Sequence, residues 1–371
     1  TGEVKAESDY YNYAGGIVGC NCGSVKNCEN SGTVNTVGQG ENIENDAGGI
    51  VGYNDGVVTD CSNEGEVAAT NGKYNYAGGI VGYNDAYDEG EICYDGEVTD
   101  CSNKGAVSTQ ELEGDYINSA GGIVGCNCGS VKNCENSGTV NSVSQEEEEE
   151  EEEEEKRNCA GGVVGHNSGE IAGCCNKGEV ATTGVYFNDA GGIVGYNESE
   201  VTDCSNMGKV TATGGAENLA GGVAGYNLGE VTDCNNKGEV TAIDGFDNFA
   251  CGIVGYNFSE VTGCCNEGAV TAKGGTPNNV AAGIAGLNFG YLYAYNAEPA
   301  AAGVNNYNTN GDADRNIENG LVGNCYNIGK VTATNGNNNL AGGVIGRNIG
   351  EAFNCYNTGE ITANGGSENS I

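Results

Sequence analysis

Cysteine is the most reactive residue type that recurs at short spacing in this chain. The segment GCNCGSVKNC occurs twice, at residues 19–28 and 125–134, and it spaces three cysteines as C-x-C-x5-C. Closely spaced thiolates bind zinc or iron and can also act as redox groups. The chain has one histidine, His166, that could complete such a ligand set. Whether these thiols converge depends on the elements that carry them.

A short repeat defines those elements. The tetrapeptide AGG(I/V) or a close variant begins at Ala14, Ala47, Ala77, Ala120, Ala160, Ala190, Ala220, Ala250, Ala281 and Ala341, most often 30 residues apart. The repeat at 220–249 holds three short β-branched runs separated by Asn-x-Gly, which suits turns. Helical periodicity is absent. The sequence therefore predicts an all-β fold, a right-handed parallel β-solenoid (β-helix) of ten or more coils, with about 30 residues and three short strands per coil.

Insertions interrupt this period. We expect a single repeat domain over 1–371, with insertions near 86–96, 144–158 and 291–322. The second contains ten consecutive glutamates, a charge run typical of a solvated loop. The third is either a degenerate coil or an excursion from the stack. Because the chain starts with Thr1 and stops before another AGG, we expect it to be a fragment or processed piece of a longer chain.

Stacked coils turn each repeat position into a column of equivalent residues. In-register neighbours lie about 4.8 Å apart, which fits an unstrained disulfide poorly. We therefore expect ten cysteines to form a ladder of reduced, buried thiols: Cys28, Cys61, Cys101, Cys134, Cys174, Cys204, Cys234, Cys264, Cys325 and Cys355. Two asparagine columns should turn the chain and stack their amides. The first includes Asn54, Asn84, Asn197, Asn227 and Asn257, and the second begins at Asn30.

The remaining candidates for metal binding are weaker. Cys20 and Cys126 should face solvent, as should Cys22 and Cys128, so each triplet splits between the two sides of the wall. Cys126, Cys128 and His166, which aligns with Cys126 one coil later, are a weak metal candidate; a local disulfide or a free thiol is the alternative. A second weak candidate is an EF-hand-like start at Asp312, Asp314 and Asn316, although it lacks the required Gly and Glu. No cofactor and no catalytic residue is expected.

The composition limits the partners. The chain has 53 acidic and 14 basic residues and a formal net charge of −39, which disfavours nucleic acids and anionic membranes. No apolar stretch approaches the roughly 20 residues of a membrane helix.

Two outer columns could contact a ligand. Tyr53, Tyr83, Tyr196, Tyr226 and Tyr256 form either a self-covering wall or a sugar-binding stripe. A threonine column could order ice, although β-propensity also explains it: Thr211, Thr241, Thr271, Thr332 and Thr362.

The pattern GG(I/V)VGYNxGxVxxCxNxGxV resembles the GLUG repeat of secreted and surface-anchored bacterial proteins. These include adhesin-like proteins and the non-catalytic flanks of some immunoglobulin A proteases. The resemblance covers nearly the whole chain, although Cys20, Cys126, His166, Leu287 and Arg347 replace the tyrosine of the pattern. It implies an extracellular or cell-surface location in a bacterium, and it brings no catalytic residues.

These features favour a non-enzymatic structural rod that serves as a stalk or adhesive segment. One alternative is a filament subunit that stacks end to end through exposed strand edges. Another is a polysaccharide-binding or polysaccharide-degrading β-helix, whose acids would be Asp60 with Asp100 or Asp203 with Asp233. Expected partners are a second copy of the chain, or a host or cell-surface protein or glycan, without insertion into a membrane.

Overall fold

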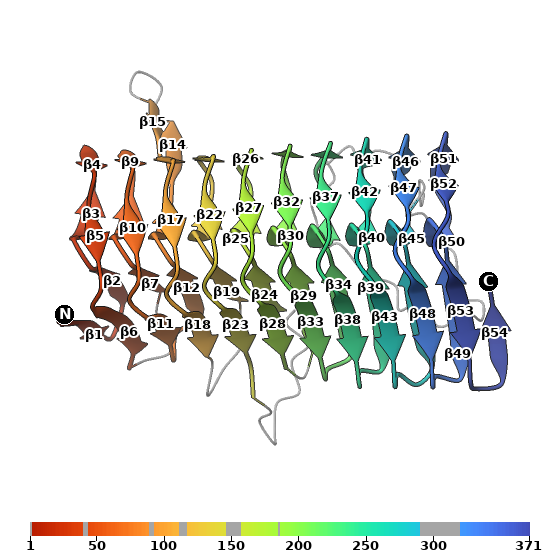
Figure 1. Ribbon diagram of the computed structural model, residues 1–371. Coiled ribbons are helices and arrows are strands. Elements are labelled where there is room, and N and C mark those ends of the chain that lie inside the picture. Colours follow the sequence, from red (N-terminus) through yellow and green to blue (C-terminus); the bar gives the residue numbers. More distant parts are fainter. Residues whose placement is uncertain are drawn as a thin grey trace.

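The chain folds into a straight rod of stacked coils, with its two termini at opposite ends (Figure 1). The computed structural model describes residues 2–39, 44–88, 93–110, 117–145, 157–184, 186–289 and 320–371. Within these ranges the secondary structure is β-strand without helix, so no helix that could cross a membrane is found there. Five long parallel sheets run along the rod, which confirms the predicted right-handed β-solenoid.

We label the sheets A to E after strands β1 to β5, and each coil visits them in the order B, C, D, E and A. Sheet B contains β2 (Tyr11–Gly15), β7 (Glu44–Gly48), β12 (Tyr74–Gly78), β19 (Ile117–Gly121), β24 (Arg157–Gly161), β29 (Phe187–Gly191), β34 (Glu217–Gly221), β39 (Asp247–Cys251), β44 (Asn278–Ala282), β49 (Asn338–Gly342) and β54 (Glu368–Ser370). Sheet C contains β3 (Val18–Asn21), β8 (Val51–Asn54), β13 (Val81–Asn84), β20 (Val124–Asn127), β25 (Val164–Asn167), β30 (Val194–Asn197), β35 (Ala224–Asn227), β40 (Val254–Asn257), β45 (Ala285–Asn288) and β50 (Ile345–Asn348).

The other three sheets complete the coil. Sheet D contains β4 (Ser24–Lys26), β9 (Val57–Thr59), β16 (Glu97–Thr99), β21 (Ser130–Lys132), β26 (Glu170–Ala172), β31 (Val201–Thr202), β36 (Val231–Thr232), β41 (Glu260–Thr262), β46 (Leu321–Gly323) and β51 (Glu351–Phe353). Sheet E contains β5 (Glu29–Asn30), β10 (Ser62–Asn63), β17 (Ser102–Asn103), β22 (Glu135–Asn136), β27 (Cys175–Asn176), β32 (Ser205–Asn206), β37 (Asn235–Asn236), β42 (Cys265–Asn266), β47 (Tyr326–Asn327) and β52 (Tyr356–Asn357). Sheet A contains β1 (Glu3–Ser8), β6 (Thr33–Gly38), β11 (Val67–Thr70), β18 (Val107–Gln110), β23 (Val140–Val143), β28 (Val180–Thr183), β33 (Val210–Thr213), β38 (Val240–Ile243), β43 (Val270–Lys273), β48 (Val331–Thr334) and β53 (Ile361–Asn364).

A coil therefore has five strands rather than the three predicted from the sequence. The apolar runs found in the sequence correspond to sheets C, D and A. The strands of sheets B and E were missed because β34 begins with two polar residues, Glu217 and Asn218, and because β37 is only two asparagines long. Asn236 points into the coil, and in the sequence this polar residue was interpreted as part of a turn.

The glycines of the AGG motif make the corner between sheets B and C. A Cβ atom on Gly221 would overlap the carbonyl oxygen of Ala224, and one on Gly222 would overlap both the carbonyl oxygen of Gly252 and the side chain of Asn236. Cys251 and Ala282 occupy the position of Gly221 in two later coils, whereas the position of Gly222 is glycine in every described coil, where a side chain would require the backbone to shift. The motif thus sets the angle at which sheet B meets sheet C.

The interior holds two apolar cores and three ladders of asparagine amides. Isoleucines, valines and the cysteine column fill one core, and alanines and valines of sheets A and B fill the other. In the two predicted ladders each Nδ2 donates to Oδ1 of the next coil, as from Asn227 to Asn257 at 2.9 Å and from Asn236 to Asn266 at 2.8 Å. Buried amides are stable here because each finds such partners.

The third ladder was missed. It lies in sheet B and is bonded at 2.8–3.2 Å. The sequence carried its signal, an asparagine two residues before each AGG. Its members are Asn12, Asn45, Asn75, Asn118, Asn158, Asn188, Asn218, Asn248, Asn279, Asn339 and Asn369.

The insertions leave the stack intact. The first forms an antiparallel hairpin, β14 (Ala86–Asp88) with β15 (Cys93–Asp95), that projects from the rod (Figure 1). For the third, β41 pairs directly with β46 and β44 with β49, so residues 290–319 add no coil to the five sheets. Most of the second insertion, and the calcium-loop candidate Asp312, Asp314 and Asn316, lie outside the described residues.

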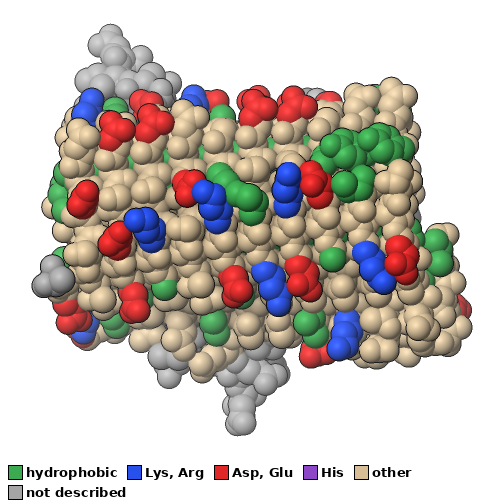
Figure 2. Space-filling view, in the orientation of Figure 1, with side chains coloured by type: hydrophobic (Ala, Val, Ile, Leu, Met, Phe, Trp, Pro, Cys, Tyr) green, Lys and Arg blue, Asp and Glu red, His purple; other side chains and the backbone are tan. Residues whose placement is uncertain are grey.

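The outer surface carries charge of both signs. On the face shown in Figure 2, acidic and basic side chains alternate along the rod. Ion pairs between coils include Lys104 with Glu64 at 2.9 Å and Lys177 with Glu135 at 2.6 Å. All four side chains are largely exposed, so each pair adds little to stability.

Candidate functional site: the groove between sheets B and C

Sheets B and C meet at a concave corner on the outside of the coil, where outward side chains of the two sheets pack against each other. We call this corner the B–C groove. It is lined by the first and third residues of the sheet B strands and by the third residue of the sheet C strands. A Cβ atom on Gly255 would lie 3.2 Å from Cβ of Leu219, so the glycine of sheet C makes room for the sheet B side chain. An apolar cluster outside the coil fills part of the groove, including Phe249, Tyr256 and Leu287.

The tyrosine column forms one wall of this groove. Tyr53 stacks on Tyr83 with ring centroids 5.6 Å apart, and Tyr196 stacks on Tyr226 at 4.9 Å. The expectation of an outer stripe is wrong for Tyr256, which is 4% exposed. Phe249 covers it at a centroid distance of 4.6 Å. Because sheet B folds over the column, these rings face the groove instead of forming a flat, open platform.

The groove already holds one guanidinium group. Arg157, the first residue of β24, places Nη1 2.8 Å from Oδ2 of Asp189, and its side chain is only 10% exposed. Its guanidinium carbon lies 5.1 Å from the ring centroids of Phe187 and Tyr196 and 4.8 Å from that of Tyr226. Burial lowers the pKa of Arg157, but Asp189 together with Tyr226, Tyr196 and Cys159 outweighs burial, and the net pKa is raised. A buried acid and aromatic rings thus hold a cation here.

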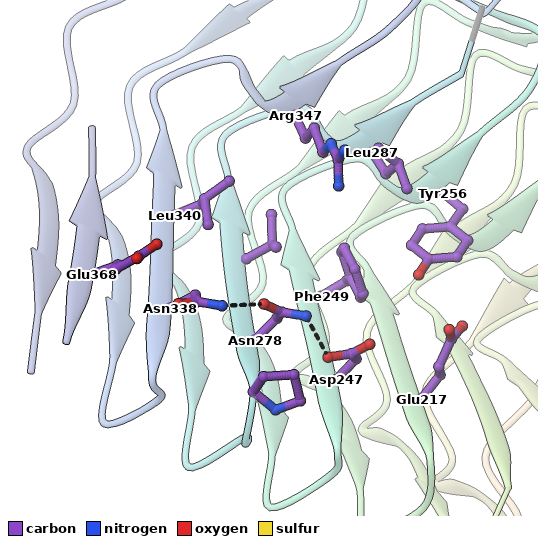
Figure 3. Close-up of a pocket in the computed structure, with 12 residues that line it drawn as sticks. Glu217, Asp247, Phe249, Tyr256, Asn278, Leu287, Asn338, Leu340, Arg347 and Glu368 are labelled. Atoms are coloured by element: carbon purple, nitrogen blue, oxygen red, sulfur yellow. Dashed lines mark hydrogen bonds between the residues drawn. The ribbon is translucent and has the colours of Figure 1, made fainter. Parts of the chain in front are cut away.

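Further along, the groove opens into a pocket of about 510 Å³. Val280 and Leu287 follow Phe249 and Tyr256 in their columns, and these smaller side chains leave the space unfilled. Phe249, Tyr256 and Leu287 are almost fully buried and provide an apolar floor. Figure 3 shows Arg347, Leu287 and Tyr256 along one side of this pocket.

The opposite wall of the pocket is polar and acidic. Along it lie Glu217, Asp247, Asn278, Asn338 and Glu368, the first residues of five consecutive sheet B strands (Figure 3). Nδ2 of Asn338 donates to Oδ1 of Asn278 at 3.0 Å, and Nδ2 of Asn278 donates to Oδ1 of Asp247 at 2.9 Å. Burial raises the pKa of Asp247, although the bonds from Asn278 oppose the rise. The pocket therefore combines an apolar floor, a partly desolvated carboxylate and a row of amides.

The structure places the predicted cysteine column in the apolar interior. Its members are buried except at the two ends, where Cys28 and Cys355 are half-buried. The described cysteines are all free thiols. Each column thiol lies close to a backbone carbonyl, such as Cys234 Sγ 3.3 Å from Thr232 O. Hydrogen bonds with the neighbouring thiols of Cys174 and Cys234, and then burial, raise the pKa of Cys204 well above its usual range.

The second cysteine triplet departs from expectation. Cys126 is buried, 6% exposed, because its column faces the groove instead of solvent. Cys128 is half-buried, and its Sγ lies 3.4 Å from the hydroxyl of Tyr83. A hydrogen bond between the two thiols, with burial, raises the pKa of Cys126; the same bond lowers that of Cys128. The first triplet matches expectation, since Cys20 and Cys22 are exposed.

His166 pairs in register with Cys126, as predicted. Its Nε2 lies 3.8 Å from Oε2 of Glu198. Among the residues that the structure describes, no three His, Cys, Asp or Glu side chains are grouped to hold a metal ion. Cys126, Cys128 and His166 are therefore neighbours without forming a three-ligand site.

The acids considered for polysaccharide cleavage have a structural explanation. Asp60, Asp100, Asp203 and Asp233 are exposed and have φ of +54°, in the turn between sheets D and E. Asn, Asp or Gly occupies this column in every described coil because they adopt the left-handed conformation readily. The threonine column lies on the outer face of sheet A, where Thr241 is buried and the others are half-buried.

Comparison with known proteins identifies the repeat. A family model described as the GLUG motif matches residues 10–35, 44–68, 73–108 and 216–241. The chain carries repeated GLUG motifs. The GLUG match at 216–241 runs from just before β34 into β38 and so spans all five sheets of one coil.

One solved structure is similar, a crystal structure from Bacteroides ovatus of a protein named provisionally as an immunoglobulin A1 protease. It is 23% identical over 57% of each chain, with a TM-score of 0.34. No curated protein matches the chain significantly.

Proposed function

We propose that this chain is a non-enzymatic rod of a bacterial cell-surface or secreted protein and serves as a stalk and adhesive segment. The observation that carries the proposal is the direct pairing of consecutive coils through five sheets, from β1 to β54. At about 4.8 Å per coil, the stack spans roughly 50 Å. A continuous stack suits a rigid spacer, since each coil is fixed by its neighbours.

The adhesive part of the proposal is supported by the pocket of the B–C groove. Its volume of about 510 Å³ lies in the range of ligand sites, roughly 300–1,000 Å³. It opens on the flank of the rod, near the end that carries β54. The non-enzymatic part is supported by the turn geometry of Asp60, Asp100, Asp203 and Asp233, which accounts for their spacing without a reaction.

Beads coated with the purified chain test the adhesive function. They should adhere to epithelial monolayers, and a Val280→Trp variant, which fills the pocket, should abolish adhesion. Thr211→Trp, on the outer face of sheet A, is the matched control and should leave adhesion unchanged. Circular dichroism should show the same β-sheet spectrum for all three proteins. Adhesion no greater than that of uncoated beads would refute the adhesive role.

A second assay tests the absence of catalysis. The chain is incubated with immunoglobulin A and with a panel of neutral and acidic polysaccharides. We expect intact immunoglobulin A and no new reducing ends or unsaturated sugars. Turnover that scales with the concentration of the chain would overturn the non-enzymatic assignment.

A further inference from the structure

The segment GCNCGSVKNC occurs twice, and its two copies have different surroundings in the fold. In the second copy, Asn127 stands between Cys126 and Cys128 and belongs to the amide ladder inside the coil. Because Asn127 points inwards, the two thiols beside it leave the coil on the same side, and a hydrogen bond joins them. Cys20 and Cys22 flank a ladder asparagine in the same way in the first copy. The local sequence is thus the same, and only the neighbouring coils distinguish the two pairs.

In the second copy, a tyrosine of the preceding coil contacts the pair. Tyr83 pairs in register with Cys126, and its hydroxyl lies 3.4 Å from Sγ of Cys128. The backbone N–H of Cys128 donates to the carbonyl oxygen of Asn84 at 2.8 Å, which fixes Cys128 on that coil. Cys126 is buried in the B–C groove, whereas Cys128 is only half-buried. A small solute can therefore reach the sulfur of Cys128 but not that of Cys126.

These contacts favour the thiolate form of Cys128. The hydrogen bond from the thiol of Cys126 is the main cause that lowers the pKa of Cys128 to about 6; burial opposes it, and the hydroxyl of Tyr83 adds to it. The smaller effects of two charges oppose each other, since Asp85 raises this pKa and His166 lowers it. The same hydrogen bond, with burial, raises the pKa of Cys126. At neutral pH, a thiolate that solvent can reach thus lies beside a buried, protonated thiol.

The first copy has different contacts. Cys20 and Cys22 are both exposed. Sγ of Cys22 donates to Oδ2 of Asp55 at 3.9 Å. A carboxylate accepts a hydrogen bond only from the protonated thiol, whereas the phenol that contacts Cys128 can donate to a thiolate. The first copy is therefore a matched control within the chain.

We propose that Cys126 and Cys128 are a redox-active dithiol that hydrogen peroxide converts to a disulfide. The thiolate of Cys128 attacks one peroxide oxygen, the O–O bond breaks and hydroxide leaves, so the sulfur is oxidised by two electrons to a sulfenic acid. The thiol of Cys126 then attacks this sulfur, an S–S bond replaces the S–O bond, and the thiol proton leaves with the hydroxyl group as water. In total, two thiols and one peroxide give one disulfide and two water molecules. This site lies apart from the pocket, and the proposal does not depend on the adhesive function.

Peptide mapping of the full chain tests the proposal. Trypsin cleaves after lysine, so peptides 6–26 and 105–132 each contain one of the two pairs and no other cysteine. The chain is treated briefly with hydrogen peroxide, and the remaining thiols are then alkylated in denaturant. Peptide 105–132 should lose two hydrogen atoms at least about tenfold faster than peptide 6–26, because peroxide reacts with the thiolate. A thiol reductant should restore both of its cysteines. Equal rates for the two peptides would overturn the proposal.

Single substitutions separate the two roles in the reaction. Cys126→Ser removes the second thiol and should leave a sulfenic acid on Cys128, which dimedone traps. Cys128→Ser should prevent oxidation of peptide 105–132. The corresponding changes in the first copy, Cys20→Ser and Cys22→Ser, should leave this peptide as reactive as before. If Cys126→Ser keeps its β-sheet circular dichroism but is not labelled by dimedone, Cys128 is not the attacked thiol and the proposal is wrong.

The pH dependence of alkylation tests the thiolate itself. Iodoacetamide should alkylate Cys128 of the folded chain with a midpoint near pH 6. Tyr83→Phe removes a donor to the thiolate and should raise this midpoint by about one pH unit. Tyr196→Phe, two coils beyond Cys126 in the same column, is the control and should not change it. A midpoint in the unmodified chain at the ordinary thiol value of about 8.5 would refute the reactive thiolate.

Discussion

Two coils of the B–C groove have an aspartate at the same position, but only one of the two aspartates forms an ion pair. Asp189 is paired with Arg157, whereas Asp46, equivalent in the column, is fully buried and neither of its carboxylate oxygens has a hydrogen-bond partner. Tyr11 stands where Arg157 would be and is 64% exposed, and Glu44 replaces Phe187. Among the described residues, the guanidinium that pairs with Asp189 therefore has no counterpart beside Asp46.

The surroundings of Asp46 differ from those of Asp189. Tyr13 and Tyr76 are the neighbours of Asp46 in the column, where Cys159 and Leu219 flank Asp189. Burial, and then the charge of Glu44, raise the pKa of Asp46 well above its usual range. Burial without a partner disfavours the charged form of an acid, so the same column position holds an ion pair in one coil and a carboxyl with a raised pKa in another.

The largest effect should come from removing the guanidinium. Arg157→Ala leaves Asp189 buried without its partner, which typically costs about 3–5 kcal/mol. Because coils unfold in units with their neighbours, hydrogen exchange should accelerate most in β24, β29 and β34. Arg347→Ala removes an exposed arginine and is the matched control, with a change of less than about 0.5 kcal/mol. Equal changes in the free energy of unfolding for Arg157→Ala and Arg347→Ala would mean that the buried ion pair does not contribute to stability.

Replacing Asp46 or Asp189 by leucine should change the free energy of unfolding with opposite sign. Leucine occurs in this column at Leu219, so its shape is accepted by the fold. Asp46→Leu should stabilise the chain by about 1–3 kcal/mol at neutral pH, because it removes an unsatisfied buried group. Asp189→Leu should destabilise it, because Arg157 loses its partner. Urea unfolding measures both, and the same sign for both would refute the contrast.

The pH dependence of stability should follow from the raised pKa of Asp46. Its folded-state pKa lies above the value of about 3.9 in an unfolded chain, so the folded state binds more protons between these two values. Stability should therefore be highest in acid and should fall as the pH rises through this window. The many other carboxylates add slopes of their own. The measured quantity is thus the difference between the unmodified chain and Asp46→Leu, which should flatten once Asp46 has titrated.

The fold could be predicted from the sequence because every coil repeats it. AGG or a close variant, the cysteine column and two asparagine columns recur in each repeat. One repeat alone would be a weak indication of short strands and turns, but ten copies of the same pattern establish it. The groove could not be predicted in the same way. Its sheet B positions change from Asp46 to Leu219 to Val280 between coils, so no column marks them. What gives these residues a common role is the angle between sheets B and C, which the local pattern does not encode.

The same reason explains the errors at single residues. Cys126 and Tyr256 were expected at the surface because their column holds residues of mixed type, including Tyr, His, Leu and Arg. These residues do lie outside the coil, but sheet B folds over that side. A residue can therefore be outside a coil and still be buried, as Cys126 and Tyr256 are at the corner between sheets B and C.

The smallest effect should come from supplying Asp46 with a cation of its own. Tyr11→Arg puts a guanidinium at the position equivalent to Arg157, one coil before the aspartate. The gain in the free energy of unfolding should be about 0.5–1 kcal/mol. It is small because Tyr13 and Tyr76, which are larger than the Cys159 and Leu219 that flank Asp189, must shift to admit the guanidinium. Tyr10→Arg, one residue earlier and exposed, is the matched control and should have no effect on stability. If Tyr11→Arg succeeds, Asp46 ionises beside the new cation and its pH-dependent loss of stability disappears. If the free energy of unfolding and its pH dependence do not change, the two coils differ in more than the presence of a guanidinium. In that case Tyr13 and Tyr76 prevent the new guanidinium from reaching Asp46.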